Sequence, residues 1–392
     1  MKLSQIEKTK LRTWVELDRR AIKKNYQTFR SIIKKDCILM AVVKSNAYGH
    51  GLVPFSKEVV KQGVKFLGVD SFEEAIELRE TGIKAKEASI MVFGYVSPAY
   101  YKQAAEQNIS LTISNFPALQ SLQKLKTKSK IKIHIKVDTG LGRQGFLMED
   151  IKKVLSLLNK SKNIQIEGLY SHLAVGEDLG GRKYTELQAS RLNQWETEFK
   201  KAGYHPLKHI CATASAMFFP EFHYDMVRVG IGMYGLWSSK ETKEAMQKKH
   251  KLFPVLSWKA IITEIKKLPK GTKIGYDLTE QLKRDSVLAV VPVGYWHGYP
   301  RLLSSKGVFN VNGKKVKLVG RVSMDMIVLD ITDVRAKVGD EVAIIGGDFG
   351  HYAEADMMAQ DSDTINYEIT TRINPIIKRF YRINPLVKRI VK

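Results

Sequence analysis

Short apolar runs alternate with amphipathic segments between residues 37 and 253 of the chain. Continuous apolar runs predict strands buried on both faces, and apolar residues at helical spacing predict helices between them. The predicted strands lie at 37–43, 66–69, 89–93, 111–113, 131–137, 164–172, 207–211 and 226–229. Helices are predicted between them, for example at 72–81, 116–127, 151–159 and 184–202. Strands and helices that alternate in this way predict an α/β fold, the (β/α)8 TIM barrel.

The pattern changes near Phe253, and beyond it the sequence predicts strands alone. These strands lie at 258–265, 287–293, 326–331 and 341–345, with a hairpin at 309–319. The hairpin turns on Asn312 and Gly313, a pair that is the strongest short-range hairpin signal. We therefore predict a barrel domain at 1–253 and a mostly-β C-terminal domain at 254–392. A strand at 14–17, followed by a charged helix at 18–31, is a candidate to pair with the C-terminal domain.

The chain carries 64 Lys and Arg against 40 Asp and Glu, a formal net charge of +24. Such an excess can indicate a nucleic-acid or membrane partner. The lysines are spread over most predicted helices and hairpins, as in Lys124, Lys126, Lys128 and Lys130, without a dominant aromatic-interleaved block. We therefore favour a solvated basic surface and no nucleic-acid partner. A basic nucleic-acid-binding protein is the alternative from another class, with the charge as its only support.

Targeting signals and cysteine usage narrow the cellular setting. No apolar run approaches the ~20 residues of a membrane span, so we expect no membrane partner. The N-terminal segment has neither the apolar core nor the cleavage site of a secretory signal. Cys37 and Cys211, the two cysteines of the chain, do not stand at disulfide-framework or metal-ligand spacing. These features predict a protein of the reducing cytoplasm without a metal site.

Lys44 is the first candidate for chemistry, because it follows the predicted strand at 37–43 within AVVKSNAYGHG. Barrel enzymes keep their reacting groups at the C-terminal ends of the strands. A lysine there is suited to bond covalently to the carbonyl group of a cofactor or substrate. A single lysine after a strand is more often a solvated loop residue, so its sequence context has to decide.

Later strand ends add further polar or glycine-rich positions: Arg143 in DTGLGRQGF, His172, Ser215, Arg228, Gly230 and Ile231. Phosphate sites in barrels use the loops after the seventh and eighth strands together with a helix N-terminus. Ser215, predicted to open a short helix, occupies such a place, as do Gly230 and Ile231. Each residue alone has an ordinary explanation, such as a helix cap or a surface charge. Their arrival together at successive strand ends would rarely arise by chance, and it favours a functional site there.

The chain resembles the alanine racemase family over essentially its full length. The resemblance rests on AVVKSNAYGHG, HIKVDTGLGRQGF, DMVRVGIGMYGL, KIGYDLT, VPVGYWHGYPR, GRVSMDM and TINYEI, which follow the family's order. It implies a barrel that binds pyridoxal 5'-phosphate, followed by a β domain. It also implies a homodimer whose two active sites are shared between the subunits.

The resemblance also implies roles for single residues. Lys44 matches the cofactor lysine and one catalytic base, and Tyr276 matches the base on the opposite face, supplied by the other subunit. Phosphate contacts are implied for Tyr48, Ser215, Gly230, Ile231 and Tyr367.

Further implied roles concern the cofactor ring and the substrate. Arg228 matches the arginine that faces the pyridine nitrogen, and both Arg228 and His172 match groups linked to the catalytic tyrosine. Arg143 matches the arginine that binds the cofactor's phenolic oxygen and the substrate carboxylate. Lys136 matches a lysine that is often carbamylated and would then face Arg143 as a negative partner. Met324 and Asp325 match residues that reach the substrate across the interface.

Three motifs depart from the family's usual pattern. Ala214 stands in place of an asparagine, which leaves one phosphate contact open. Trp296 and His297 stand in place of a common Ala-Asp pair, and Ser323 replaces a frequent cysteine. None of these changes removes a base.

The activity that the resemblance implies is interconversion of L-alanine and D-alanine, which supplies D-alanine for cell-wall peptidoglycan. Pyridoxal phosphate weakens the Cα–H bond of a bound amino acid. Racemisation then needs one base that removes a proton on one face and a second that returns it on the other. A serine or broad-specificity racemase of the same fold is the closest alternative, because the sequence does not define the size of the substrate pocket.

Overall fold

A computed structural model describes residues 10–161, 163–346 and 354–382 of the chain. The chain divides into two compact units. The barrel unit comprises Ile22–Ala47 and Phe55–Phe253, and the β unit comprises Met1–Ala21, Tyr48–Pro54 and Pro254–Lys392. The β unit thus takes in two early segments in addition to the residues after 253, and the first of them contains the strand at 14–17 that is a candidate to pair with this domain. Each unit is described by itself below.

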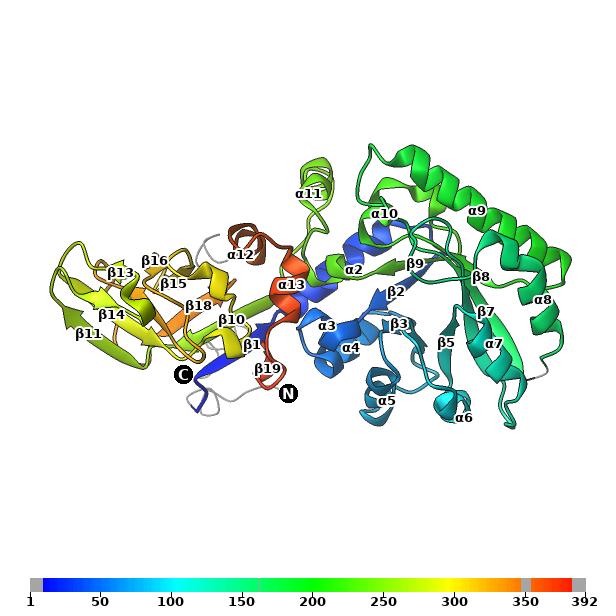
Figure 1. Ribbon diagram of the computed structural model, residues 1–392, viewed down its shortest axis with the longest axis horizontal. Helices are drawn as coiled ribbons and strands as arrows, with labels where there is room; N and C mark the ends of the chain where they lie inside the picture. Colours follow the sequence, from blue (N-terminus) through cyan, green and yellow to red (C-terminus); the bar gives the residue numbers. More distant parts are fainter. Residues whose placement is uncertain (1–9, 162, 347–353, 383–392) are drawn as a thin grey trace, which may run out of the picture. The chain divides into compact units, whose positions relative to one another are not determined.

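The barrel unit is built on an eight-stranded parallel sheet with the order β8-β7-β6-β5-β4-β3-β2-β9 (Figure 1). Its strands are β2 (Ile38–Val42), β3 (Phe66–Val69), β4 (Ser89–Val92), β5 (Ile109–Ile113), β6 (Ile131–Lys136), β7 (Ile164–Tyr170), β8 (Leu207–His209) and β9 (Met226–Val229). The two end strands meet through backbone bonds from Asp225 N to Lys208 O (3.1 Å) and from Arg228 N to Cys211 O (3.0 Å). The predicted eight-stranded barrel is therefore confirmed, and it is nearly closed.

Helices follow most of these strands. The α-helices are α2 (Arg19–Ile32), α4 (Leu52–Lys61), α5 (Phe72–Glu80), α6 (Tyr101–Glu106), α7 (Phe116–Gln123), α8 (Ile151–Asn159), α9 (Arg182–Lys201), α10 (Thr213–Phe218) and α11 (Lys240–Met246). The segment labelled α3 (Lys44–Tyr48) is a short turn without right-handed helical backbone angles at residues 45–47. Short 3-10 turns are η1 (Pro98–Tyr100), η2 (Met148–Asp150), η3 (Pro220–Phe222) and η4 (Ile231–Tyr234). Side-chain caps begin several helices: Ser71 Oγ accepts from Glu74 N (3.2 Å), and Asn115 Oδ1 accepts from Ala118 N (2.9 Å).

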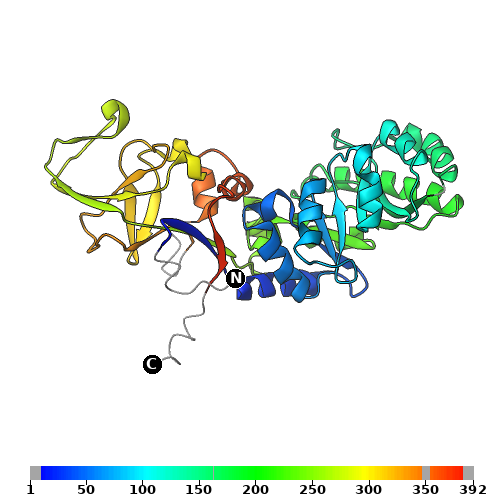
Figure 2. The same ribbon diagram turned by 90° about the horizontal axis from the view of Figure 1, so that it is seen from below.

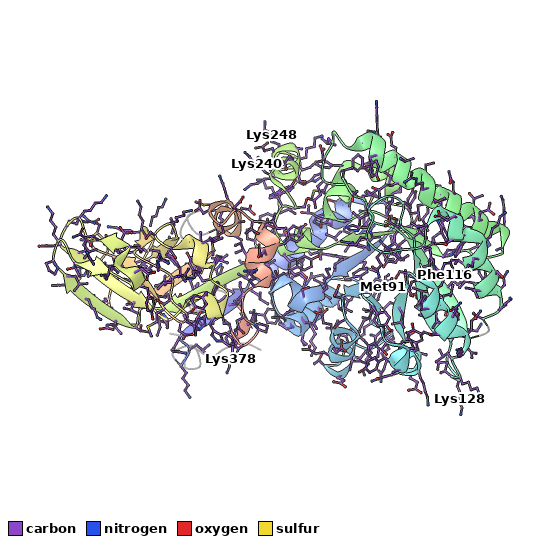
Figure 3. The ribbon with its side chains drawn as sticks, viewed as in Figure 1. Met91, Phe116, Lys128, Lys240, Lys248 and Lys378 are labelled. Carbon is purple, nitrogen blue, oxygen red and sulfur yellow. The ribbon has the colours of Figure 1, made fainter. Side chains whose placement is uncertain are left out.

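The centre of the barrel is packed with large side chains. One buried cluster joins residues of β2, β3, β4, β7 and β9: Met40, Phe66, Met91, Tyr170 and Met226. These strands come from different sides of the barrel, so their shared cluster lies inside it. Figure 3 labels Met91 among the strands, whereas the labelled Lys128 and Lys240 lie at the periphery. The interior of the barrel is therefore filled by side chains, and this packing holds the strand ends in place.

The β unit contains a nine-stranded sheet with the order β11-β14-β17-β16-β15-β18-β10-β1-β19. Its strands are β1 (Thr13–Leu17), β10 (Leu256–Ile261), β11 (Glu264–Leu268), β14 (Ser286–Val291), β15 (Val308–Val311), β16 (Lys314–Leu318), β17 (Ile327–Asp330), β18 (Glu341–Ile345) and β19 (Arg379–Tyr381), and a separate pair is formed by β12 (Lys273–Ile274) and β13 (Glu280–Gln281). Strand β1 pairs antiparallel with β10 and parallel with β19. In Figure 2, β1 is the blue strand and β19 is the red strand beside it. Both ends of the described chain therefore contribute to one sheet.

Two details of this unit differ from the sequence prediction. The strand predicted at 258–265 is two strands, because β10 pairs with β1 and β18 whereas β11 pairs with β14. The stretch predicted as strands alone also contains α12 (Ala355–Asp361), α13 (Asn366–Thr371) and the 3-10 turns η5 (Tyr276–Leu278), η6 (Tyr295–His297) and η7 (Arg301–Leu303). These helical segments are too short for a clear helical period.

The predicted hairpin is confirmed between β15 and β16. Asn312 and Gly313 both have positive φ, 51° and 83°, as a two-residue turn of this kind requires. Among the described residues, no helix has the length and apolar character needed to cross a membrane.

Candidate active site

Lys44 lies directly beyond the end of β2. Val43 N still donates to Gly68 O on β3 (2.7 Å), and the chain then leaves the sheet at Lys44. The lysine side chain is 39% exposed, and its Nζ lies 3.5 Å from Asp70 Oδ1. The predicted position of Lys44 at a strand end is therefore seen in the structure, with an amine that a ligand can reach.

The turn after Lys44 has an unusual backbone. Ser45, Asn46, Ala47 and Tyr48 all have φ between 51° and 56°, which is the left-handed region. Each non-glycine residue in that region costs roughly 1–2 kcal/mol, and such strain is concentrated at functional sites.

Glu74 on α5 supports this turn. Its Oε1 accepts from Asn46 N (3.0 Å), and its Oε2 accepts from Asp70 N (3.0 Å). One carboxylate therefore ties the strained turn to the end of β3.

Arg228 on β9 is buried beside Lys44's strand, since β2 and β9 pair with Met40 opposite Arg228. Its Nη2 donates to Ser171 O (2.8 Å), Ile210 O (2.9 Å) and His172 Nδ1 (3.2 Å). Its Nη1 donates to His209 Nδ1 (2.7 Å). Burial lowers the pKa of Arg228 to about 10, so the guanidinium stays charged at neutral pH.

The two histidines beside Arg228 are neutral. Burial, and then the charge of Arg228, holds the pKa of both His172 and His209 well below the ordinary value. A guanidinium can only donate, so each histidine must accept through Nδ1 and carry its proton on Nε2. Both His172 and His209 are therefore in the Nε2-protonated tautomer.

A chain of hydrogen bonds leads from Arg228 through the barrel interior. His209 Nε2 and His134 Nδ1 are 3.0 Å apart, and His134 Nε2 lies 3.1 Å from Glu167 Oε2. Glu167 also bonds to Ser110 Oγ and lies 3.3 Å from Lys132 Nζ. Burial alone would raise the pKa of Glu167, but the bond from His134 and these neighbours lower it to about 2.

Lys136 occupies the last position of β6 and is 4% exposed. Its Nζ lies 4.4 Å from the centre of the Tyr170 ring. Burial, followed by the charges of Arg228 and Arg143, holds the pKa of Lys136 well below its ordinary value. The amine is thus favoured in its neutral, nucleophilic form.

The loop that carries Arg143 is organised around Asp138. Oδ1 of this carboxylate accepts from the amides of Gly140 (2.9 Å), Leu141 (2.8 Å) and Gly142 (3.1 Å). Its Oδ2 accepts from Arg143 N (2.8 Å). Burial would raise the pKa of Asp138, yet these amide bonds lower it overall, so the nest of amides stays filled by an anion.

The residues predicted to bind phosphate from the barrel unit come from the segments after β8 and β9. Helix α10 begins at Thr213, two residues before the predicted start at Ser215. Ser215 Oγ accepts from Ala212 N (2.8 Å). Thr213 Oγ1 accepts from Gly230 N (3.2 Å), which joins the two segments, and Ile231 opens η4. The amide of Gly230 therefore already has an acceptor within the chain.

The remaining predicted phosphate residues, Tyr48 and Tyr367, lie together in the β unit. Their ring centres are 5.9 Å apart. The segment after Tyr48 packs closely on α13, since a Cβ placed on Gly49 would lie 1.8 Å from Thr370 O. Arg379 clamps the same segment by donating from Nε to Gly49 O (3.2 Å).

Tyr276 and Met324, also in the β unit, are 68% and 55% exposed. Asp325 is exposed next to Met324. Trp296, 58% exposed, is held beside this loop because its backbone N donates to Met324 O (3.0 Å). Large aromatic and methionine side chains exposed in this way commonly mark a contact surface.

Sequence reasoning missed four residues of the barrel group: His134, Asp138, Glu167 and His209. The sequence pattern of β6 could have revealed one of them, His134. Along β6 the side chains of Lys132, His134 and Lys136 fall on alternate positions, so all three point to one face of an otherwise apolar strand. Polar residues on the inner face of a barrel strand indicate a functional interior. Within residues 10–161, 163–346 and 354–382, no group of three or more His, Cys, Asp or Glu could hold a metal ion.

The protein has a parallel barrel with a lysine at a strand end and a second, β-rich unit. These features place it among two-domain enzymes built on a barrel. The profile described as "Alanine racemase, N-terminal domain" matches residues 17–238, and "Alanine racemase, C-terminal domain" matches residues 255–381. The chain therefore belongs to the alanine racemase family, and by that membership it is an isomerase.

Individual relatives agree with this assignment. Alanine racemase from Leptospira interrogans is 38% identical over 375 residues, which cover 94% of this chain and 95% of the relative. The solved alanine racemase of Clostridium difficile 630 superposes with a TM-score of 0.88 at 30% identity, covering 95% of this chain and 96% of that one. A structure from Bartonella henselae "with covalently bound pyridoxal phosphate" gives a TM-score of 0.80 at 26% identity, covering 95% and 100%.

Proposed function

We propose that this protein is a pyridoxal 5'-phosphate-dependent alanine racemase that acts with two bases, Lys44 and Tyr276. The observation that carries the proposal is that Lys44 follows β2, while the neighbouring strand β9 holds a buried, charged Arg228. An aldehyde cofactor needs an accessible amine, and a pyridine nitrogen can accept from a guanidinium. The donor set of the barrel unit therefore fits the cofactor.

The cofactor, when bound, supplies an electron-withdrawing system that weakens the Cα–H bond of the amino acid. Lys44 holds the cofactor covalently through Nζ. Arg228 donates a hydrogen bond to the pyridine nitrogen and keeps that nitrogen unprotonated. A guanidinium can only donate and stays positively charged, so the nitrogen facing it must accept. His172 and His209 are neutral, so neither neighbour neutralises Arg228.

The two bases move protons on opposite faces. Once the amino group of the substrate has replaced Lys44 on the cofactor, the freed Lys44 Nζ would take the Cα proton of D-alanine, and Tyr276 Oη would take that of L-alanine. Each base returns a proton to the face that the other has emptied, so the configuration inverts. Arg228 and His172 are the groups linked to the tyrosine in this proposal.

The phosphate group is assigned to Tyr48, Tyr367, Ser215, Gly230 and Ile231. The proximity of the Tyr48 and Tyr367 rings supports a shared role for these hydroxyls. Ser215 and Ile231 offer a hydroxyl and amides at the starts of α10 and η4. Gly230 contributes less to this set than the others, because its amide donates to Thr213.

Arg143 binds the substrate carboxylate and the phenolic oxygen of the cofactor, with Met324 and Asp325 completing the substrate contacts. We assign a carbamate to Lys136: the neutral amine adds to carbon dioxide, forms an N–C bond and releases one proton. The resulting anion would offset the positive charges of Arg143 and Arg228. The low pKa of the buried Lys136 amine supports this step.

The active unit is a homodimer with shared sites, in which Tyr276 comes from the other subunit. Exposure of Tyr276, Trp296 and Met324 on the β unit supports a partner surface there. The reaction product, D-alanine, is used for peptidoglycan. Cytoplasmic location is supported by Cys37 and Cys211, which are free thiols.

The deciding experiment is an amino-acid panel incubated with cofactor-loaded protein and resolved by chiral chromatography. Alanine should interconvert fastest, and a Lys44→Ala protein should convert nothing. Faster turnover of serine would retain the racemase and change its substrate. Failure to interconvert any amino acid, together with salt-dependent retention of oligonucleotides, would reject the proposal in favour of nucleic-acid binding.

A further inference from the structure

One face of helix α9 carries three polar side chains directed at the strand ends of the barrel. Tyr184, Gln188 and Arg191 are spaced at i, i+4 and i+7, so they share one side of the helix. All three bond to the segments that follow β6 and β7. We call these residues the α9 clamp.

Gln188 is the centre of the clamp and is 0% exposed. Its Oε1 accepts from Ala174 N (2.8 Å), and its Nε2 donates to His172 O (3.1 Å) and Thr139 Oγ1 (3.3 Å). An amide nitrogen can only donate and a carbonyl can only accept, so the orientation of this side chain is unambiguous. One glutamine thereby joins the segments after two strands.

Tyr184 and Arg191 hold the start of the Arg143 loop. Tyr184 Oη donates to Gly140 O (2.6 Å), and Arg191 Nη1 donates to Thr139 O (2.9 Å). The approach is so close that a Cβ on Gly140 would lie 2.6 Å from the Tyr184 hydroxyl. Thr139 Oγ1 is also 2.7 Å from Ser171 Oγ, the residue before His172.

We propose that the α9 clamp is the positioning element of the reaction, fixing the Arg143 loop with Tyr184 and Arg191 and fixing His172 with Gln188. The inference rests on the proposed function, because it acts through the roles assigned to Arg143 and His172. Asp138 gives the loop its internal shape, whereas the clamp sets where the loop stands on the barrel. His172 is held by its backbone carbonyl from Gln188 and by its ring from Arg228.

Loss of a clamp donor has a defined consequence. The part-buried carbonyls of Thr139 and His172 need donors, since unsatisfied buried carbonyls are costly, whereas the exposed Gly140 carbonyl loses its link to α9. Without the clamp the segment must turn toward water, and the misplacement of a reacting or binding group by about 1 Å can cost a hundredfold in rate.

The first test uses Tyr184→Phe, with Tyr204→Phe as the matched control. Tyr184 is 40% exposed, so losing its hydroxyl leaves the fold intact. Tyr204 Oη also makes a hydrogen bond near α9, but to Asn159, away from the strand ends. Tyr184→Phe should raise KM for alanine about three- to tenfold with kcat within about twofold, as expected for one lost hydrogen bond that acts on substrate binding. Tyr204→Phe should leave both constants unchanged.

The second test uses Gln188→Glu, with Gln123→Glu as the control. The glutamate keeps the acceptor for Ala174 N but turns a carboxylate oxygen toward the carbonyl of His172. Gln123 likewise donates to a backbone carbonyl, that of Leu157, on the surface between α7 and α8. Gln188→Glu should lower kcat about tenfold or more, whereas Gln123→Glu should not.

Isotope effects separate positioning from a general loss of stability. With L-alanine deuterated at Cα the rate ratio should rise in Gln188→Glu, because proton removal by the His172-linked tyrosine becomes slower. With deuterated D-alanine the ratio should not rise. A purely structural role would leave both ratios as in the wild type.

The outcomes distinguish this inference from the proposed function. A wild-type protein without racemase activity would overturn the proposed function and, with it, the inference. An active wild type with unchanged KM in Tyr184→Phe would overturn the inference alone, even if Gln188→Glu failed to fold. Faster amide hydrogen exchange at residues 139–145 in Tyr184→Phe, beside the shifted KM, would support the clamp.

Discussion

His297 stands where the family commonly has an aspartate, and its ring makes a backbone contact. Nδ1 accepts from Gly294 N (3.2 Å), which closes the turn that presents Tyr295 and Trp296. An imidazole can accept at Nδ1 only while neutral, whereas a carboxylate can accept at any pH above about 4. The histidine therefore makes this turn sensitive to acid.

The sign of that sensitivity follows from the pKa of His297. Burial is the largest effect and lowers the pKa of His297. The charge of Asp325 raises this pKa and that of Arg12 lowers it, so the pKa lies below the ordinary value of 6.5 overall. The unfolded chain then binds the proton first, so stability is complete above pH 6.5 and falls as pH drops toward the folded pKa. His297→Asp should lose less stability than the wild type between pH 7.5 and pH 5, by about 1 kcal/mol. Urea unfolding at both pH values measures this, and equal losses would contradict it.

Lys44 has a prediction of its own at the residue scale. Borohydride reduction of the cofactor-loaded protein, followed by peptide mapping, should place the pyridoxyl group on Lys44. Lys44→Arg keeps the charge beside Asp70 but should take up no label. Labelling of another lysine while Lys44 remains unmodified would reject the site assignment.

At the scale of elements, the left-handed turn between β2 and α4 depends on a contact from α5. Glu74 accepts hydrogen bonds from the amides of Asn46 and Asp70, so Glu74→Ala leaves two donors near Lys44 without their acceptor. We expect a loss of about 1–2 kcal/mol in unfolding free energy and weaker retention of the cofactor on gel filtration. Glu73→Ala is the control, because Glu73 is exposed in the same first turn. Similar losses in both variants would attribute the effect to the helix dipole instead.

Element boundaries show where sequence patterns stop being informative. Apolar alternation continues through residues 262–263, so the pattern joined β10 and β11 into one strand. The division is made by partners: Ile262 N donates to Asp340 O, whereas Thr263 N donates to Val290 O. A period of two identifies the buried face of a strand, but it carries no information on which neighbour the strand joins.

At the scale of the whole molecule, the two bases are predicted to come from different chains. Inactive Lys44→Ala and Tyr276→Phe homodimers, mixed under conditions of subunit exchange, should regain activity. A heterodimer contains one site with both bases, so recovery should approach about half the wild-type activity per heterodimer under two-fold symmetry. If exchange is demonstrated by mass and activity does not return, both bases belong to one chain.

The sequence by itself determined the barrel, the β-rich second part and the place of Lys44 at a strand end. Strands buried on both faces and amphipathic helices are local patterns, and Asn312 with Gly313 determines a turn through its own backbone preferences. Lys44 was predictable because its motif and the strand that it ends are contiguous.

Only the tertiary structure decided how distant polar groups meet. Glu167, His134, His209 and Arg228 come from four separate strands, and their contact depends on the register between those strands. The grouping of Tyr48–Pro54 with α13 and β19 likewise joins segments about 330 positions apart, through Arg379 and Gly49. Burial patterns specify which face of an element turns inward, but the partner it meets is selected by packing of the entire fold.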